Sequence, residues 1–251
     1  IMSSFHAMWS LGAGIGAGIG AILASYNIGI QMHFTIISIV IFLVILSILS
    51  IPFQSEKKER ENNAPFISIP KGPLLSVAFI TFFASLGEGA VADWSAIFLI
   101  SVASINDGSA ALGFTVFSIC MFAMRLMGDK IAFKFGPSKT ARYSGLVALT
   151  GSIILLLFES LTPLLIGFSL IGLGIAVIIP LAFSRAGNDK NVSQGKAIAS
   201  IATLGYGGML LGPLFVGFIA EATSIKTSFF ILPLLALLIF LLSKHLSIKS
   251  Q

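Results

Sequence analysis

Residues 74–100 read LLSVAFITFFASLGEGAVADWSAIFLI, and this stretch decides the fold. It is long and apolar enough to cross a bilayer as one helix, which takes about 20 residues at ~1.5 Å of rise each. Two carboxylates interrupt it, with Glu88 at its midpoint and Asp93 further along. A charge at that depth costs at least ~2.5–3.5 kcal/mol, so Glu88 must face protein or water and not lipid.

Helical spacing puts the two acids on different faces. Asp93 lies about 140° round the helix from Glu88, at ~100° per residue, among small side chains. We predict that the face of Glu88 forms the wall of a polar cavity, and that Asp93 hydrogen-bonds to an adjacent helix at a packing face. The alternative is that both acids only fix helix packing. The polar stripe that carries Glu88 consists of Thr81, Ser85, Glu88, Ala92 and Ser95.

The composition of the whole chain indicates an α-helical membrane protein. Hydrophobic residues make up 56% of it and charged residues only 10%, and the mean hydropathy is +1.01. Soluble domains average about 25% charged residues. Long apolar runs cross a bilayer as helices because every backbone polar group must be paired within the segment. The net charge of +5 does not indicate nucleic acid binding, since the cations lie in short loops between apolar runs.

The apolar runs predict an all-α bundle of about eight transmembrane helices. A mixed-charge segment, 54–70, cannot enter the membrane and is predicted to be a solvated linker. It divides the chain into residues 1–53, with two spans, and residues 71–251, with six. The start on Ile1 suggests that an upstream part is missing. The predicted spans are 5–25, 33–51, 74–100, 111–127, 143–158, 164–183, 197–220 and 229–242.

Glycine spacing marks helix faces that pack closely. In the seventh span, residues 208–212 form a GxxxG motif, followed by Pro213, which can kink the helix. His6, at the start of the first span, is expected to be a polar helix-end residue, with a proton relay as the alternative. The first span has two overlapping sets of glycines that allow close approach on two faces, Gly12/Gly16/Gly20 and Gly14/Gly18.

Lysine and arginine fall in alternate loops, which predicts the orientation. Cytoplasmic loops carry the Lys/Arg excess. We therefore expect a multi-pass protein of the plasma (inner) membrane whose 54–70 linker and C-terminus are cytoplasmic. The opposite loops hold only Lys226. The cations of the predicted cytoplasmic loops are Lys57, Lys58, Arg60, Lys130, Lys134, Lys139, Arg142, Arg185, Lys190, Lys196, Lys244 and Lys249.

A second motif begins at the end of the fourth span, where residues 125–136 read RLMGDKIAFKFG. Gly128 allows a tight exit from the helix. Asp129 can cap the N-terminus of a neighbouring helix, which favours a carboxylate by ~0.3–1 kcal/mol, and Arg125 can hold that carboxylate in place. We predict that this corner is a latch that stabilises one arrangement of two helix bundles. The alternative is an ordinary basic loop.

At this corner the chain resembles the major facilitator superfamily. Those transporters carry a Gly-Asp pair, a basic residue and a glycine after the second helix of each half. The matching residues here are Gly128, Asp129, Lys134 and Gly136, with Arg125 before them. Further stretches that look like an uncharacterised bacterial inner-membrane branch of this superfamily are 87–95, 172–180 and 205–213.

The resemblance implies a fold of twelve helices in two six-helix halves, of which this chain matches the fifth to the twelfth. The helices without a counterpart here supply one wall of the substrate cavity in that family. By the pseudo-symmetry of the halves, Asp129 is expected close to Arg125 or to the start of the first span, near Ser3, Ser4 and Phe5.

Secondary active transport of a small solute by alternating access is the predicted function, with proton coupling as an option. Glu88 is the first candidate for the group that titrates or contacts substrate, because burial favours the neutral form of a carboxyl group. Ser85, Asp93, Trp94 and Tyr206 are further candidates for the substrate or proton pathway, although both aromatic residues can equally serve helix packing.

Two other readings stay open. The chain can be a truncated fragment that folds without transporting. An intramembrane enzyme is the remaining class, and the sequence argues against it because it holds no Gly-x-Ser-x-Gly, no His-Glu-x-x-His and no cysteine pair. We therefore expect no enzyme activity, no metal and no cofactor, and name the lipid bilayer, a small-molecule substrate and protons as partners.

Overall fold

The computed structural model describes residues 2–26, 28–49, 70 and 72–247, and within these ranges it holds helices and no strand. This confirms the predicted all-α class. The long helices are α1 (Met2–Ser25), α2 (Ile30–Leu49), α3 (Pro73–Ala103), α5 (Leu112–Phe135), α6 (Pro137–Leu157), α7 (Leu161–Ile175), α8 (Ile178–Gly187), α9 (Gln194–Ala222) and α11 (Ile231–Leu242). Short turns of helix are α4 (Asp107–Ala110), α10 (Ile225–Ser228) and the 3₁₀ turn Ser243–Leu246. The 54–69 part of the predicted linker lies outside the described residues.

Seven helical segments of the described part are both long and apolar enough to cross a membrane. They are α2, α3, α5 with α4, α6, α7 with α8, α9, and α11 with its flanking turns. The remaining helix of membrane length, α1, has 24 residues, which at ~1.5 Å per residue is about 36 Å. The prediction of about eight spans agrees with this arrangement.

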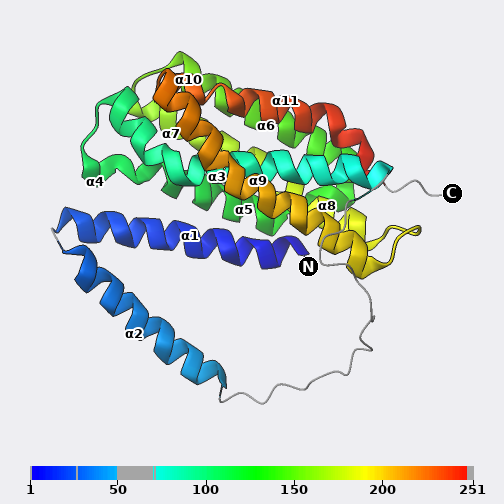
Figure 1. The fold of residues 1–251 in the computed structure, drawn as a ribbon, viewed down its shortest axis with the longest axis horizontal. Coiled ribbons are helices and arrows are strands. Elements are labelled where there is room, and N and C mark those ends of the chain that lie inside the picture. Colours follow the sequence, from blue (N-terminus) through cyan, green and yellow to red (C-terminus); the bar gives the residue numbers. More distant parts are fainter. Residues whose placement is uncertain (1, 27, 50–69, 71, 248–251) are drawn as a thin grey trace.

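The long helices run back and forth, so their ends gather at two opposite ends of the bundle (Figure 1). One end holds the starts of α3, α6 and α9 and the ends of α5, α8 and α11. The other end holds α4, α10 and the α1–α2 turn. Lys226 of α10 lies at this second end. Cations at the first end are Lys130, Lys134, Lys139, Arg142, Arg185, Lys190, Lys196 and Lys244.

The corner motif has a different shape from the predicted one. Helix α5 does not end at Gly128 but continues to Phe135, and α6 begins at Pro137. Gly136 makes the turn with φ of 83°, a backbone conformation that glycine adopts without strain. Proline suits the first turn of a helix because its missing N–H would be unpaired there anyway. The segment between the predicted spans 111–127 and 143–158 is therefore a helical corner centred on Gly136, and the predicted exit at Gly128 is wrong.

Helix α3 is the centre of the larger bundle and packs most closely against α9. A methyl group at Gly208 would overlap the carbonyl oxygen of Phe82, and one at Gly212 would overlap the carbonyl oxygen of Leu86. Only glycine lets the two backbones come this close. The close packing predicted for the GxxxG of residues 208–212 is therefore confirmed, and it fixes the side of α3 that faces α9.

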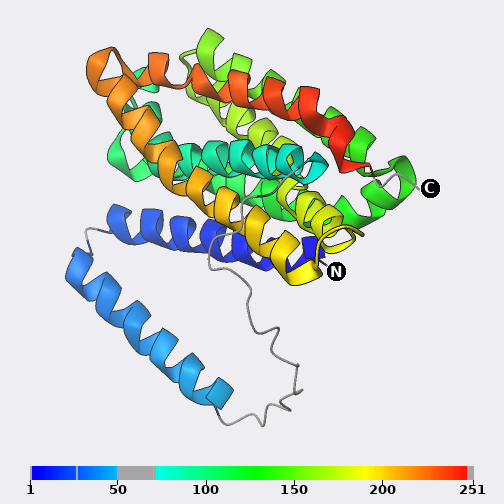
Figure 2. The same cartoon turned by 45° about the vertical axis from the view of Figure 1, so that its right-hand side comes forward.

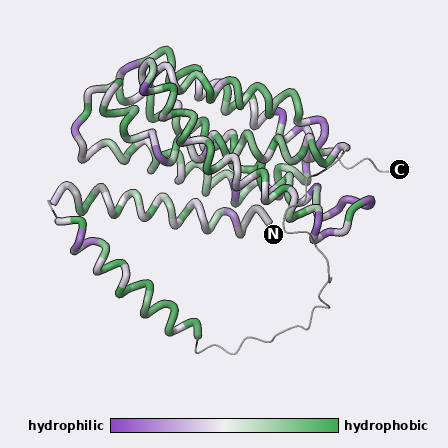
Figure 3. The backbone as a smooth tube through the Cα atoms, in the orientation of Figure 1, coloured by the Kyte–Doolittle hydropathy of each residue, from purple (hydrophilic) through white to green (hydrophobic). Residues whose placement is uncertain are grey.

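Helix α1 lies along α5, and α2 runs apart from the bundle in both views (Figures 1 and 2). On α1 the Cβ position of Gly14 is 3.2 Å from Cβ of Ser118, whereas Gly12, Gly16 and Gly18 have no such neighbour within 4 Å. Close approach is thus seen at one of the predicted glycine positions and not along two whole faces. No described residue of α2 is buried, although the helix is apolar after its polar start, where Gln31 and His33 lie (Figure 3).

Candidate functional site

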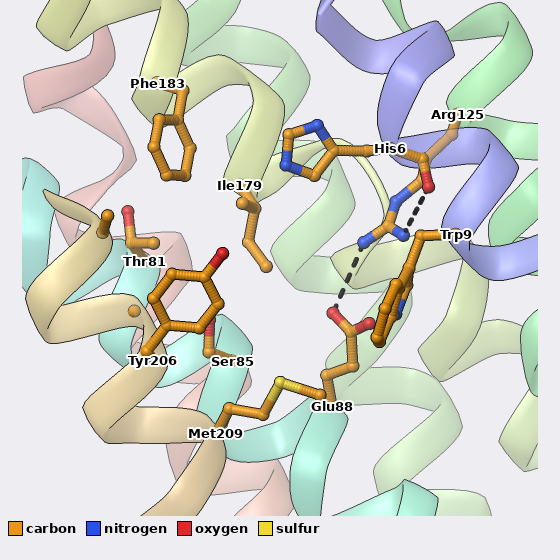
Figure 4. Close-up of a pocket in the computed structure, with 12 residues that line it drawn as sticks. His6, Trp9, Thr81, Ser85, Glu88, Arg125, Ile179, Phe183, Tyr206 and Met209 are labelled. Carbon is orange, nitrogen blue, oxygen red and sulfur yellow. Dashed lines mark hydrogen bonds and ion pairs between the residues drawn. The ribbon is translucent and has the colours of Figure 1, made fainter. Parts of the chain in front are cut away.

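A cavity of about 360 Å³ opens between α1, α3, α5, α8 and α9 (Figure 4). Its wall is mostly apolar and aromatic, with one acid and one arginine. Such a concave, largely apolar space with a few convergent polar groups is the usual form of a small-molecule site. The lining residues are His6, Trp9, Thr81, Ser85, Glu88, Arg125, Ile179, Phe183, Ala202, Gly205, Tyr206 and Met209.

Glu88 reaches this cavity because of its angle on α3. Thr81 and Ser85 precede it on the same face and also line the cavity, while Ala92 and Ser95 of the predicted stripe do not. Ser95 is fully buried, and its hydroxyl has no hydrogen-bond partner among the described residues. The polar stripe of α3 therefore faces the cavity over its first half and packed helices over its second half.

The partner of Glu88 is Arg125 of α5. Nη2 of Arg125 donates to Oε2 of Glu88 at 3.3 Å, and their side chains are 1% and 11% exposed. The sequence assigned Arg125 to the corner motif, but its side chain enters the cavity. An acid and a base buried together satisfy each other's charge, whereas either one alone in a membrane would be strongly unfavourable.

The other described donors of Arg125 go to α1 and to the break between α7 and α8. Nε donates to the carbonyl oxygen of Ala176 at 3.1 Å. Nη1 donates to the carbonyl oxygen of His6 at 3.0 Å and to the hydroxyl of Ser10. One guanidinium group thereby joins α1, α3, α5 and the α7–α8 break.

A proline explains why the carbonyl of Ala176 is available to Arg125. In a continuous helix that carbonyl would accept from the N–H of residue 180, but Pro180 has no N–H to donate. Helix α7 ends at Ile175, and α8 begins at Ile178. Arg125 thus satisfies a carbonyl that the proline leaves unpaired, as buried backbone in a membrane requires. The predicted sixth span, 164–183, is broken at this point.

The structure places Tyr206, Ser85 and Glu88 together at the cavity, and it places Asp93 and Trp94 elsewhere. Nε1 of Trp94 donates to the carbonyl oxygen of Pro213 at 3.0 Å, so this indole joins α3 to α9. Asp93 is exposed, and its carboxylate has no hydrogen-bond partner among the described residues. The predicted hydrogen bond from Asp93 to an adjacent helix is therefore wrong: Asp93 lies one turn after Gly89, on the side of α3 that packs against α9, but its side chain is exposed and not enclosed between the two helices.

The corner residues Gly128, Asp129, Lys134 and Gly136 do not line the cavity. Nζ of Lys134 lies 5.4 Å from the ring centre of Phe135. The predicted approach of Asp129 to residues 3–5 falls on side chains outside the described part of the chain. The latch stays a prediction.

Several cavity residues were not predicted as site residues, namely His6, Trp9, Phe183 and Met209. His6 had been assigned to a helix end, but its ring faces Phe183 with centroids 5.9 Å apart. The available signal was the polar start of α1, where His6, Trp9 and Ser10 precede an otherwise small and apolar helix. Among the described residues, no group of three or more His, Cys, Asp or Glu side chains could hold a metal ion.

Comparisons with known sequences identify the family. The family model described as Major Facilitator Superfamily matches residues 1–193. An uncharacterized transporter of Sinorhizobium fredii is 40% identical over 243 residues, which is 97% of this chain and 64% of that protein. An uncharacterized MFS-type transporter of Yersinia pestis is 33% identical over 237 residues, 94% of this chain and 61% of that protein. The chain thus spans less than two thirds of either relative's length.

Solved structures with the same fold are also transporters. The crystal structure of the Escherichia coli fucose:proton symporter FucP matches with a TM-score of 0.64 at 21% identity, over 90% of this chain and 58% of FucP. The peptide transporter POT in complex with sulfate matches with a TM-score of 0.58 at 20% identity, over 71% of this chain and 39% of POT. At these identities the likeness concerns the fold alone. Together with the family model and the two relatives, it leads to the conclusion that this chain belongs to the major facilitator superfamily.

Proposed function

We propose that this chain carries out secondary active transport of a small solute by alternating access, with the cavity around Glu88 as the binding site. The observation that carries the proposal is the buried ion pair of Glu88 and Arg125 at the wall of a 360 Å³ cavity. Ionisable residues inside transmembrane helices commonly mark substrate or ion pathways. Relatives named as transporters support the same class of activity.

The ion pair offers a way to couple protons to movement. Arg125 donates to the carboxylate of Glu88 and at the same time bonds α1 and the α7–α8 break. Protonation of Glu88 would remove the negative charge that Arg125 faces and would weaken the link between α3 and α5. A proton that reached Glu88 would in this way release one helix arrangement in favour of another, as alternating access requires.

The orientation and the division of the chain belong to the same proposal. The cations gathered at one end of the bundle support a cytoplasmic position for that end and for the C-terminus. We place residues 1–53 with one half of a transporter and residues 71–251 with the other, joined by a cytoplasmic linker at 54–70. The corner at Gly136 then lies on the cytoplasmic side, where a latch between halves would act.

The test is proton movement in vesicles. The chain is reconstituted into liposomes that enclose a pH-sensitive dye, and gradients of candidate solutes are imposed one at a time. We expect at least one solute to move protons in these vesicles and not in empty ones. Glu88→Gln should abolish this response, while Asp93→Asn, the same chemical change outside the cavity, should leave it in place.

Two results would contradict the proposal. If Glu88→Gln keeps the full pH dependence, the carboxylate has no coupling role. If no solute moves in any vesicle although the protein is folded and inserted, the chain is a non-transporting product, which is the alternative. The non-transporting alternative deserves this test because no described residue of α2 is buried against the rest of the chain.

A further inference from the structure

The ionisable groups of the cavity set the charge that its ligand can carry, and this inference rests on the proposed function. We propose that the cavity binds an uncharged solute rich in hydroxyl groups, and that this solute and the proton compete for Glu88. The ionisable residues in the lining are Glu88, Arg125, His6 and Tyr206. The acid and the arginine form an ion pair, so an uncharged ligand leaves the pair's charge balance unchanged.

An anionic ligand would have to compete for the guanidinium group of the cavity. Each nitrogen of the Arg125 guanidinium already donates to a protein acceptor, on Ala176, on His6 and Ser10, or on Glu88. A carboxylate or phosphate that approached this group would compete with these acceptors. It would also lie close to the carboxylate of Glu88, and a second negative charge in a buried site is strongly unfavourable.

A cationic ligand meets the opposite difficulty. It could approach Glu88, but the guanidinium of Arg125 lies 3.3 Å from the same carboxylate. Two positive charges would then share one negative charge in a site where the Arg125 side chain is 1% exposed. Arginine does not lose its proton in proteins, so this repulsion persists at every pH of interest.

The acceptor left for a neutral ligand is the second carboxylate oxygen of Glu88. Oε2 takes the hydrogen bond of Arg125, and no described residue donates to Oε1. A hydroxyl group can donate to Oε1 without adding charge, and such charge-assisted bonds are about twice as strong as neutral ones. The hydroxyls of Ser85 and Tyr206, also in the lining, can serve as donors or acceptors for further hydroxyl groups.

The rest of the wall suits the carbon face of such a solute. The side chains of Trp9 and Tyr206 are 64% and 70% exposed, and Figure 4 shows their rings bordering the space above Glu88. Met209 and Phe183 add apolar surface. A compact ring with hydroxyl groups on its edge and C–H groups on its faces matches this combination of one acceptor with aromatic walls.

Competition with protons follows from the same contact. A protonated Glu88 no longer offers a charged acceptor to the solute, so a proton on Glu88 weakens the binding of the solute, and bound solute weakens the binding of the proton. Binding of the solute should therefore weaken as the pH is lowered.

The experiment uses the fluorescence of Trp9 with three probes of nearly equal shape and different charge. These are methyl α-glucoside, glucuronate and glucosamine, each titrated at constant ionic strength into the full chain in liposomes. We expect saturable quenching by the neutral glucoside, with glucuronate and glucosamine binding at least tenfold more weakly. Trp9→Phe should remove the signal, and acidification should weaken the binding of the glucoside.

The controls separate loss of binding from loss of fold. Glu88→Gln should weaken glucoside binding at least tenfold and make it independent of pH, while Asp93→Asn should bind as the wild type does. Helical content by circular dichroism reports whether each variant is folded. If Glu88→Gln does not fold, the pH dependence of the wild type decides in its place.

The proposal is overturned if glucuronate or glucosamine binds as tightly as the glucoside, if none of the three quenches Trp9, or if acidification leaves binding unchanged. In these cases solute-driven proton movement can still be found in vesicles, which would leave the proposed transport standing and reject only the ligand class.

Discussion

Arg125 on α5 and Glu88 on α3, 37 positions apart in the sequence, form an ion pair of 3.3 Å at the wall of the cavity. Both side chains lie in segments that are otherwise apolar enough to cross a membrane. The pair therefore decides two properties together. It makes the burial of two charges tolerable, and it holds an acid at the wall of the cavity.

Replacing one member of this pair should destabilise the protein more than replacing both. Arg125→Met leaves the carboxylate of Glu88 buried without its partner and frees three further acceptors, so a loss of ~3–5 kcal/mol is expected. The double variant Glu88→Met with Arg125→Met carries no buried charge and should recover part of this loss. Thermal unfolding in detergent measures both effects. A double variant that is as unstable as the sum of the single ones would mean that the two residues do not interact.

The contact between α3 and α9 should be sensitive to a single methyl group. Gly208→Ala pushes a Cβ into the carbonyl oxygen of Phe82, and overpacking of this kind typically costs ~1–3 kcal/mol. Gly207→Ala is the matched control, since nothing lies within 4 Å of its Cβ position. Alanine is the better helix former by up to ~1 kcal/mol, so this control should be neutral or stabilising. Equal melting temperatures for both variants would contradict the close approach.

Trp94 should behave as a packing residue and not as a transport residue. Trp94→Phe removes the hydrogen bond to the carbonyl of Pro213, and interhelical hydrogen bonds in membrane proteins contribute about 0.6 kcal/mol on average. We expect a small drop in melting temperature and unchanged solute flux in vesicles. Loss of flux in a folded Trp94→Phe variant would return this residue to the site.

An exposed ion pair at the end of the bundle that holds α10 should make a small, pH-dependent contribution to the free energy of unfolding. Nζ of Lys226 donates to Oε1 of Glu159 at 2.7 Å, and this bond lowers the pKa of the Glu159 carboxyl group. A lowered pKa means that the contribution is present above the ordinary pKa and is lost as the pH falls through the lowered one. The stability difference between wild type and Glu159→Gln should thus be small at pH 7 in low salt and should vanish in acid or in high salt. A difference that grows on acidification would contradict this sign.

The sequence was sufficient for the helices and for the face of Glu88, because both depend on local spacing. Apolar length gives the spans, and the helical angle puts Thr81, Ser85 and Glu88 on one face. The partner of Glu88 was beyond this reasoning. Nothing local joins positions 88 and 125, and the helical angle does not reveal which helix lies opposite. Arg125 was recognised near the end of the fourth span, but it was interpreted as part of the motif that follows it in the sequence.

The corner at Gly136 shows a second limit. A glycine inside an apolar run can end a helix or can lie within it. The local sequence predicted a helix end at Gly128, but this glycine lies within α5. The better signal was the pair Gly136-Pro137, in which glycine supplies the positive φ and proline the first helical turn. The hydrogen bond predicted for Asp93 was wrong for a related reason. Its angle to Glu88 was predicted, but whether a helix covers that side depends on the assembled bundle.

The most direct test of the account is an infrared titration of the protonation of Glu88. The C=O stretch of protonated carboxyl groups is recorded for the chain in liposomes as the pH is lowered through the range in which proton-coupled flux changes. We predict a band that grows over this range in the wild type and in Asp93→Asn, and that is missing in Glu88→Gln. An identical titration in all three proteins would mean that Glu88 does not take up the proton, and the central claim would be contradicted.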